Sequence, residues 1–347
     1  MIKDDGPWLV NLGDSIDRLI TIDTTGRGVI RDLYHAARIK QGSPLTYLAA
    51  RGLAERVGKG DVVVIATGME ILPWHRPEQD GPVGGATLAR ALLMAFGAKP
   101  VFVTEPQHVP VIETSVKAAG LYVFPLEQVK ELPTSAAVVS FPIDPAEAEA
   151  AAQRLLTEYK PKALISIERA GANEFGEYHA ALGRSLTPWS AKVDVLFELA
   201  KAQGILTIGI GDGGNELGCG LIRDTVIEKV PLGGKCKCPC GGSIVPRFLP
   251  DVLIMACISN WGSYGIEALL SAIIGDPEVL HSADLDQRVH DYAAHAGANN
   301  DGPGFLDPGT DAVPAHLHGH IVDLLAFLVK TGGDPGRLYR VPRYRWS

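Results

Sequence analysis

Short apolar runs alternate with amphipathic stretches along most of this chain. The apolar runs are rich in β-branched residues and end at glycine or at polar residues, which is typical of strands buried in a parallel sheet. They predict strands at 61–68, 100–104, 121–124, 136–141, 163–167, 207–210 and 251–257.

Between these runs, apolar residues recur at the spacing of amphipathic helices. In the last such helix, at 316–330, we expect Leu317, Ile321, Leu324 and Leu328 to be buried. The other predicted helices span 29–40, 44–57, 84–97, 108–119, 145–158, 191–203, 215–229, 261–274 and 284–296.

This order of strands and helices predicts the fold class. Strands that alternate with helices form right-handed crossovers, which give a mostly parallel sheet with helices on both faces. We therefore expect an α/β fold, a Rossmann-like three-layer sandwich. We expect a single domain over 1–347, with an N-terminal cap segment at 1–60 and the sheet core at 61–331.

Polar motifs follow four of the predicted strands. Ligands of parallel sheets bind beyond the carboxyl ends of the strands, so we expect these motifs to converge on one site. They are Thr67-Gly68, Glu168-Arg169, Asp212 with Asn215 and Glu216, and Ser259-Asn260.

The glycine-rich stretch 206–220 is the most distinctive of these motifs. Its glycines permit a sharp turn, and Asp212 and Glu216 lie four residues apart across the predicted helix start. Two carboxylates and the amide of Asn215 suit a hard divalent cation or a substrate ammonium group. The spacing also matches the dinucleotide pattern G-x-G-x-x-G, but Asp212 would repel a pyrophosphate. A tight turn with a purely structural role is the third interpretation.

Two further carboxylates are candidates for the same site. Glu168 would face the pocket beside Asp212, or else form a structural ion pair. Asp80 lies in the loop after the first predicted strand, where it could join the site or cap a helix.

Composition limits which partners the protein can bind and indicates its cellular compartment. The 347 residues carry a net charge of −8 without a basic run, which argues against binding to nucleic acid or to an anionic membrane surface. No apolar run reaches the ~18 residues of a membrane span. The acidic N-terminus does not resemble a secretory signal, and five cysteines do not form a disulfide framework, so we expect a cytoplasmic protein. Apolar helix faces are consistent with a homo-oligomer.

Two clusters of metal-ligand residue types remain ambiguous. Cys236, Cys238 and Cys240 supply three closely spaced thiols but lack the second knuckle of a zinc site, which Cys219 or Cys257 would have to complete. Reduced thiols in a glycine-rich turn are the simpler interpretation. The other cluster is His316, His318 and His320 at the start of the last predicted helix. His316 and His320 lie four residues apart on one face and could form a metal pair, or the three could be a polar helix entry.

Taken together, several blocks resemble the D-glutamate cyclase family. The resemblance runs from about residue 14 to residue 331, and the blocks at 207–218 and 259–264 are its most specific parts. The chain departs from the family pattern at 178–186 and at 236–240. The remaining matches are Ile167-Glu-Arg169, Gly171, Tyr178, Ala66-Thr-Gly68, Asp80-Gly-Pro82, Asp301-Gly302 and Asp311.

The resemblance implies conversion of D-glutamate to 5-oxo-D-proline with loss of water, assisted by a divalent metal such as Mg²⁺ or Mn²⁺. A metal-dependent hydrolase or lyase acting on another small amino or hydroxy acid is the alternative, and a non-catalytic small-molecule binding protein is a third. If the protein is a D-glutamate cyclase, the metal ligands would be Asp212, Glu216, Glu168 and Asp80. The catalytic residues would be Glu168, Asp212 and Asn215. The substrate would be bound by Arg169, Asn260, Gly213, Gly214 and Tyr178.

Overall fold

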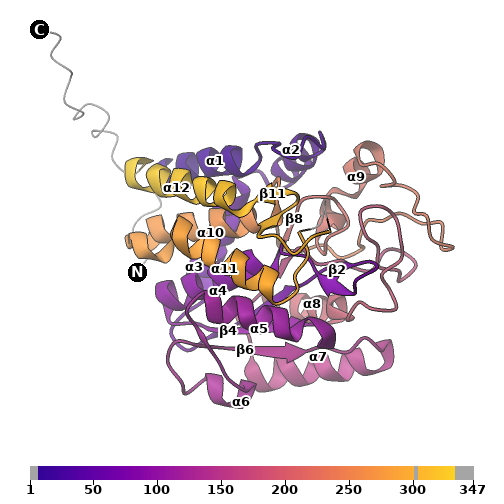
Figure 1. Cartoon of the computed structure of the whole chain (residues 1–347), viewed down its shortest axis with the longest axis horizontal. Helices are drawn as coiled ribbons and strands as arrows, with labels where there is room; N and C mark the ends of the chain where they lie inside the picture. Colours follow the sequence, from indigo (N-terminus) through magenta and orange to yellow (C-terminus); the bar gives the residue numbers. More distant parts are fainter. Residues whose placement is uncertain (1–6, 301–303, 333–347) are drawn as a thin grey trace, which may run out of the picture.

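Seven parallel strands form the central sheet of the protein (Figure 1). The computed structural model describes residues 7–300 and 304–332. Every neighbouring pair of strands is parallel, which confirms the predicted α/β class. In spatial order the strands are β5 (Tyr122–Val123), β6 (Ser135–Ser140), β4 (Lys99–Thr104), β1 (Val62–Thr67), β7 (Ala163–Ile167), β8 (Leu206–Gly211) and β9 (Val252–Met255).

Helices cover both faces of this sheet, as predicted. On β1, Val63 and Ile65 face one apolar core, whereas Val62 and Val64 face the other. Helices α7 (Pro145–Tyr159) and α8 (Val193–Ala202) cover the second face. The helices that contribute to the first core are α1 (Pro7–Ile20), α2 (Ile30–Gln41), α3 (Leu45–Arg56), α4 (Pro82–Phe96), α5 (Val109–Ala118), α9 (Arg223–Lys229), α10 (Ser259–Ile274), α11 (Ala283–His295) and α12 (Ala315–Gly332).

The strand order places a topological switch point beside β1. The chain passes from β1 to β4 on one side of the sheet and returns to β7 on the other side. Loops that follow β1 and β7 therefore diverge, and a crevice forms at the carboxyl ends of these two strands. The other strands of the described residues form two short antiparallel hairpins. One pairs β2 (Glu70–Ile71) with β3 (Arg76–Pro77), and the other pairs β10 (Gly309–Thr310) with β11 (Val313–Pro314).

The N-terminal segment holds one helix more than predicted. Helices α2 and α3 match the two expected patterns, and α1 precedes them. Polar Asp17 interrupts the apolar stripe of α1, yet it is fully buried. Its carboxylate accepts hydrogen bonds from the backbone amides of Leu45 (2.6 Å) and Thr46 (3.1 Å). Asp17 therefore satisfies free amides at the start of α3, a role that is not visible in the local pattern.

The buried face of α12 differs from the predicted one. Leu317 and Leu324 are 42% and 50% exposed, whereas Ile321 is buried as expected. His318 occupies the core instead, because its Nδ1 accepts a hydrogen bond from the indole of Trp261 at 2.9 Å. Its Nε2 donates to the carbonyl of Val313 at 3.1 Å. The prediction was wrong because a histidine with two buried partners fixes the rotation of the helix.

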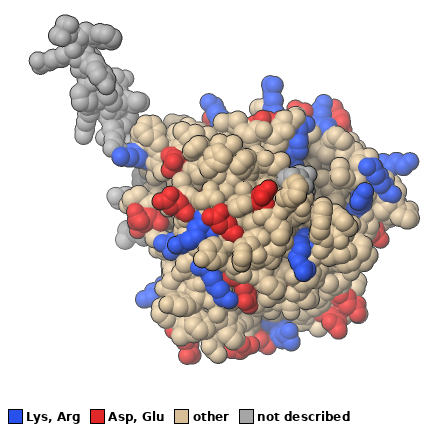
Figure 2. All heavy atoms as spheres, viewed as in Figure 1, with Lys and Arg blue, Asp and Glu red and all other residues tan. Residues whose placement is uncertain are grey.

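Surface charges are dispersed on the visible face of the molecule. Figure 2 shows Lys and Arg side chains scattered among acidic ones rather than gathered into a continuous basic patch. Among the helices in the described part of the chain, none is long and apolar enough to span a bilayer.

Candidate active site

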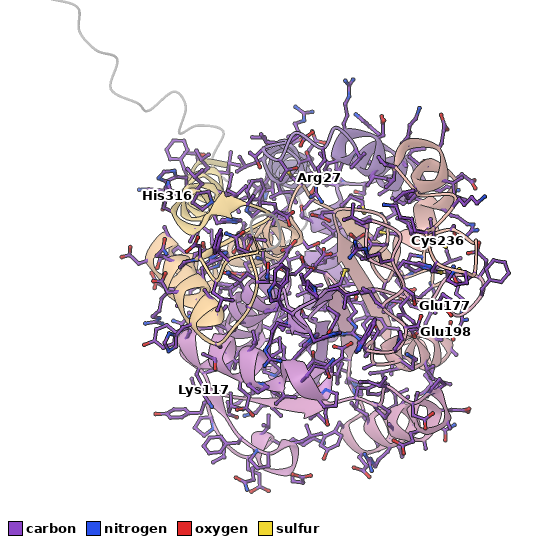
Figure 3. The ribbon with its side chains drawn as sticks, turned by 45° about the vertical axis from the view of Figure 1, so that its right-hand side comes forward. Arg27, Lys117, Glu177, Glu198, Cys236 and His316 are labelled. Carbon is purple, nitrogen blue, oxygen red and sulfur yellow. The ribbon has the colours of Figure 1, made fainter. Side chains whose placement is uncertain are left out.

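A cavity of about 310 Å³ lies beside the carboxyl ends of β7 and β8. Part of its wall is apolar and comes from Met69, Leu72 and residues 178–186, which an antiparallel bridge between His179 and Ser185 folds into a hairpin. Its other lining residues include seven charged ones, namely Arg27 (labelled in Figure 3), Glu70, Glu78, Glu168, Arg184, Asp212 and Asp311.

Three buried carboxylates form a cluster here: Glu168 and Asp212 line the cavity, and Asp80 lies next to them without lining it. Asp80, Glu168 and Asp212 each offer an oxygen atom, and these atoms lie within 4.8 Å of one another. The three residues follow β1, β7 and β8, so the parallel sheet brings them together, as the strand-end argument predicted. An oxygen cluster of this kind matches the ligands that hard divalent cations prefer.

Glu168 is aimed at the cluster by an unusual backbone conformation. The residue has a φ of +43°, in the left-handed region that a side chain rarely adopts. Strand β7 ends immediately before it, at Ile167. The hydroxyl of Ser259 donates a hydrogen bond to the Glu168 carboxylate at 2.6 Å. Such local strain persists where the surrounding contacts impose it, and it is common at functional sites.

Asp80 caps a helix, although that helix is α10 rather than the one that follows it in the sequence. Its two carboxylate oxygens accept hydrogen bonds from the backbone amides of Ser259 (2.8 Å) and Asn260 (2.7 Å). These are the first residues of α10, so Asp80 satisfies the free amides at the start of that helix. The same carboxylate lies within the three-residue cluster.

The glycine-rich loop does not continue into the helix predicted at 215–229. The backbone after β8 stays irregular until a 3₁₀ turn at Cys219–Ile222, and α9 spans only Arg223–Lys229. The Glu216 carboxylate accepts hydrogen bonds from the amides of Gly213 and Gly214, both at 2.7 Å. The loop is thus folded around this carboxylate, which is why the helix starts late.

This arrangement changes the roles expected of the loop residues. Glu216 does not belong to the three-carboxylate cluster, and its two oxygens hold the backbone amides of Gly213 and Gly214. The same bonds occupy two amides that a substrate or a phosphate group would need. A Cβ on Gly211 would lie 2.6 Å from the Glu216 carboxylate, so that glycine serves the packing of the loop. The site therefore offers no support for a dinucleotide at this motif.

Arg169 was expected to hold a substrate carboxylate, and the structure places it elsewhere. Its guanidinium forms a two-pronged ion pair with Glu105. It also donates to the carbonyls of Gly68 (2.9 Å) and Ala191 (3.0 Å). Arg169 is only 1% exposed and does not line the cavity. β7 ends before Glu168. The side chains of Glu168 and Arg169 therefore have different partners, Ser259 for the first and Glu105 for the second.

Tyr178 and Asn260 also have structural partners. The Tyr178 hydroxyl donates to the buried carboxylate of Asp194. The Asn260 side-chain oxygen accepts from the amides of Gly81 (2.9 Å) and Gly84 (2.7 Å), at the start of α4. Neither residue lines the cavity, so both support the site rather than face a ligand.

Asn215, in contrast, lies where it was predicted. It lines the cavity, and its side-chain amide donates to the carbonyl of His179 at 3.0 Å. Its side-chain orientation is thus fixed by the hairpin at 178–186.

Two arginines of the cavity were not predicted. Arg27, from the loop between α1 and α2, contacts the carboxylate of Asp212 and lies 3.0 Å from that of Asp311. The only signal in the sequence was its position in a Gly-Arg-Gly turn. Arg184 is exposed at the cavity wall, within the hairpin that departs from the family pattern. Asp301 and Gly302, also part of that pattern, lie outside the described residues.

The carboxylates of the site carry unbalanced charge. Burial, followed by the charge of Asp212, raises the pKa of Asp80 to about 8. Burial and the same neighbour raise the pKa values of Glu168 and Asp311 well above their usual range. Arg27 alone does not offset these charges. A bound divalent cation would favour the ionised carboxylates and reverse these shifts.

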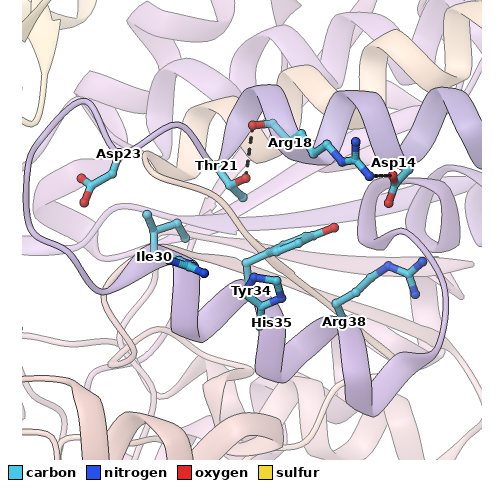
Figure 4. Close-up of a pocket in the computed structure, with 9 residues that line it drawn as sticks. Asp14, Arg18, Thr21, Asp23, Ile30, Tyr34, His35 and Arg38 are labelled. Carbon is cyan, nitrogen blue, oxygen red and sulfur yellow. Dashed lines mark hydrogen bonds and ion pairs between the residues drawn. The ribbon is translucent and has the colours of Figure 1, made fainter.

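A second hollow lies between α1 and α2 (Figure 4). Its volume is about 600 Å³, but it contains none of the three clustered carboxylates. Two of its charged groups, Asp14 and Arg18, form an ion pair at 2.6 Å. The cavity beside β7 and β8 is therefore the candidate active site.

Comparison with known proteins agrees with this geometry. Residues 16–326 match the family described as "D-glutamate cyclase-like, C-terminal". The human protein "D-glutamate cyclase, mitochondrial" is 26% identical over 267 residues, which are 74% of this chain and 38% of the human protein. The match thus spans well under half of that relative's length. The matched family covers most of the chain, including every carboxylate of the cavity, and the protein belongs to the D-glutamate cyclase-like family.

Proposed function

We propose that this protein is a lyase that converts D-glutamate to 5-oxo-D-proline by a metal-assisted intramolecular dehydration. The observation that carries the proposal is the convergence of Asp80, Glu168 and Asp212 within 4.8 Å at a cavity large enough for a small amino acid. Membership of the family and the name of the human relative support the same reaction.

Mg²⁺ or Mn²⁺ is the cofactor that fits this site. Three buried oxygen ligands suit a hard cation, and their unbalanced charge leaves a deficit that a divalent ion would fill. Asp80, Glu168 and Asp212 would hold it. Bound there, the ion supplies charge stabilisation, worth several kcal/mol, to the γ-carboxylate of the substrate.

The reaction needs proton transfer as well as charge stabilisation. The α-amine attacks the γ-carboxyl carbon, the C–N bond forms, and one carboxyl oxygen leaves as water. The substrate ammonium loses two protons, and the departing oxygen gains both. Glu168 is the candidate to move them, because its buried carboxylate lines the cavity beside Asp212. Glu168 acts in this step either directly or as a metal ligand.

The cavity can also hold the substrate in a bent conformation. Arg184 is positioned to meet the α-carboxylate, and Asn215 can orient the reacting groups. Confinement of a short chain in about 310 Å³ brings the amine towards the carboxylate, which gives the entropic advantage of an oriented intramolecular reaction.

A second enzymatic function is favoured by one observation. The hairpin at 178–186, which departs from the family pattern, supplies five cavity residues: Ala180, Ala181, Leu182, Arg184 and Leu186. A different wall would admit a different ligand, so the alternative is a hydrolase or lyase with the same metal site and another small amino or hydroxy acid as substrate.

Proton NMR of metal-stripped protein tests the proposal. D-glutamate and L-glutamate are incubated separately, with and without added Mg²⁺ or Mn²⁺, and the ring protons of 5-oxoproline are followed. We expect metal-dependent turnover of the D isomer. If neither isomer reacts while Mn²⁺ remains bound, as measured by electron paramagnetic resonance, D-glutamate is not the substrate. Turnover in a panel of related acids would then support the second function, and binding without turnover would indicate a binding protein.

The cytoplasmic location and a homo-oligomeric state are further parts of the proposal. Exposed apolar side chains on α12, at Leu317, Leu324 and Phe327, favour association of subunits. Light scattering coupled to size-exclusion chromatography tests the second point, and a monomer at micromolar concentration would contradict it.

A further inference from the structure

A second cluster of metal-ligand atoms lies beside the cavity, in the region of Cys236 in Figure 3. The sulfur atoms of Cys236, Cys238 and Cys240 lie 3.2–3.4 Å from one another. The imidazole Nε2 of His179 lies 3.3 Å from the Cys238 sulfur and 3.7 Å from the Cys240 sulfur. Four ligand atoms from two loops thus face one point.

The spacing fits a tetrahedral zinc ion. Zinc–sulfur bonds of about 2.3 Å and zinc–nitrogen bonds of about 2.0–2.1 Å place tetrahedral sulfurs about 3.8 Å apart, and sulfur and nitrogen about 3.5 Å apart. The observed sulfur pairs would have to separate by only a few tenths of an ångström. The missing fourth ligand of the C-x-C-x-C sequence is therefore supplied from 57 residues upstream, by His179 rather than by another cysteine.

We propose that His179, Cys236, Cys238 and Cys240 bind a structural Zn²⁺ ion. Three thiolates and one imidazole form a closed, soft ligand set that selects zinc over Mg²⁺ or Mn²⁺. Each thiol releases its proton when the ion binds. The other two cysteines have different partners: the Cys219 sulfur donates to Glu216 at 3.2 Å, and that of Cys257 lies near Thr24 and Thr25.

The surrounding loops support this assignment. Residues 231–251 contain no helix or strand, and irregular segments of this length are uncommon unless something organises them. The amide of Gly242 donates to the Cys240 sulfur at 3.4 Å, a bond suited to a thiolate. The amide of Lys237 donates to the carbonyl of Gly183 at 2.8 Å, so the two ligand-bearing loops are already joined.

Zinc at this position would act on the active site from outside it. His179 lies in the hairpin that supplies five cavity residues, and its carbonyl accepts the hydrogen bond from Asn215 at 3.0 Å. Cross-linking of this hairpin to residues 236–240 would fix the cavity wall. His179 is therefore a positioning residue, and its expected effect on catalysis is indirect.

Metal analysis of the full chain tests the site without reference to turnover. After expression with zinc and treatment with EDTA at neutral pH, we expect one zinc per chain by plasma mass spectrometry. Replacement by Co²⁺ should give the intense visible bands of a tetrahedral thiolate site. Cys238→Ser and His179→Ala should lose the bound zinc, and the matched control Cys257→Ser should retain it.

Two results would overturn the proposal. One is wild-type protein that takes up neither Zn²⁺ nor Co²⁺ although three thiols in this cluster react with a thiol reagent. The other is a mass lower by two hydrogens, which would show a disulfide within the cluster. If the variants do not fold, wild-type protein is titrated with an organomercurial, which reacts with thiols. Zinc should then be released in proportion as the three cysteines react. A zinc-loaded protein that fails to convert D-glutamate would contradict the proposed function and leave the zinc site intact.

Discussion

The two clusters of ligand atoms in this protein are assembled in different ways. The carboxylate cluster rests on loops that follow β1, β7 and β8, so a rigid parallel sheet determines where its three residues meet. The thiol cluster joins a hairpin to an irregular loop and has no such support. A site that must exchange substrate needs ligands positioned in advance, whereas a structural ion can itself organise the segments that bind it.

A similar contrast appears among the buried acids of the sheet edge. Glu105 is matched by Arg169, and although burial raises its pKa, the charge of that guanidinium holds it well below the usual range. Asp80 and Glu168 lack a comparable partner, and burial raises their pKa values. Glu105 is thus balanced by a cation, whereas Asp80 and Glu168 share a cluster with a third carboxylate, that of Asp212.

The largest effect is expected for Asp212→Asn. Loss of one negative ligand should lower cation affinity and reduce kcat/KM for D-glutamate about 1,000-fold, which corresponds to several kcal/mol of lost charge stabilisation. Zinc content should not change, because Asp212 is not part of the thiol cluster. Asp224→Asn, an exposed position on α9, is the matched control. Full activity and unchanged Mn²⁺ affinity in Asp212→Asn would remove the central metal ligand from the proposal.

The next effect separates two arginines of different roles. Arg169→Met leaves Glu105 buried without its partner, which should lower the free energy of unfolding by about 3–5 kcal/mol. Urea denaturation followed by circular dichroism measures it. Arg184→Ala should leave stability unchanged, because this side chain is exposed at the cavity wall.

For Arg184→Ala the expected change is in substrate binding. A lost charge-assisted hydrogen bond of about 1.5–3 kcal/mol corresponds to an increase in KM of about ten- to a hundredfold, with kcat nearly constant. If Arg169→Met instead raised KM without loss of stability, the sequence-based role of Arg169 would be restored and our assignment of the two arginines would be wrong.

The sequence predicted which loops meet at the site but not which atoms face the ligand. Parallel strands alone bring Asp80, Glu168 and Asp212 to one edge, so their convergence follows from the strand pattern. Arg169 is adjacent to Glu168, yet the backbone turns into the left-handed region at Glu168 and the two side chains have different partners. No local pattern reports such a turn at a residue other than glycine.

Contacts between distant segments were the other part that the sequence did not reveal. Arg27 reaches Asp212 across 185 residues, and His179 reaches the three cysteines across more than 50. Spacing within a motif carries no information about such pairs. The cysteine motif looked incomplete because its fourth ligand comes from another loop.

The smallest effect is expected for Glu216→Gln. It decides whether Glu216 stabilises the loop or binds the metal. In the structure its carboxylate accepts hydrogen bonds from Gly213 and Gly214, so Glu216→Gln would turn an amide nitrogen towards a backbone donor. We expect a loss of about 1–3 kcal/mol in the free energy of unfolding, the cost of leaving a buried group unsatisfied. Cation affinity should change little by comparison with Asp212→Asn. Calorimetric titration with Mn²⁺ and urea denaturation, performed on the same preparation, separate the two outcomes. A marked fall in Mn²⁺ affinity at unchanged stability would make Glu216 a metal ligand, as its position in the sequence first indicated, and would extend the carboxylate cluster from three members to four.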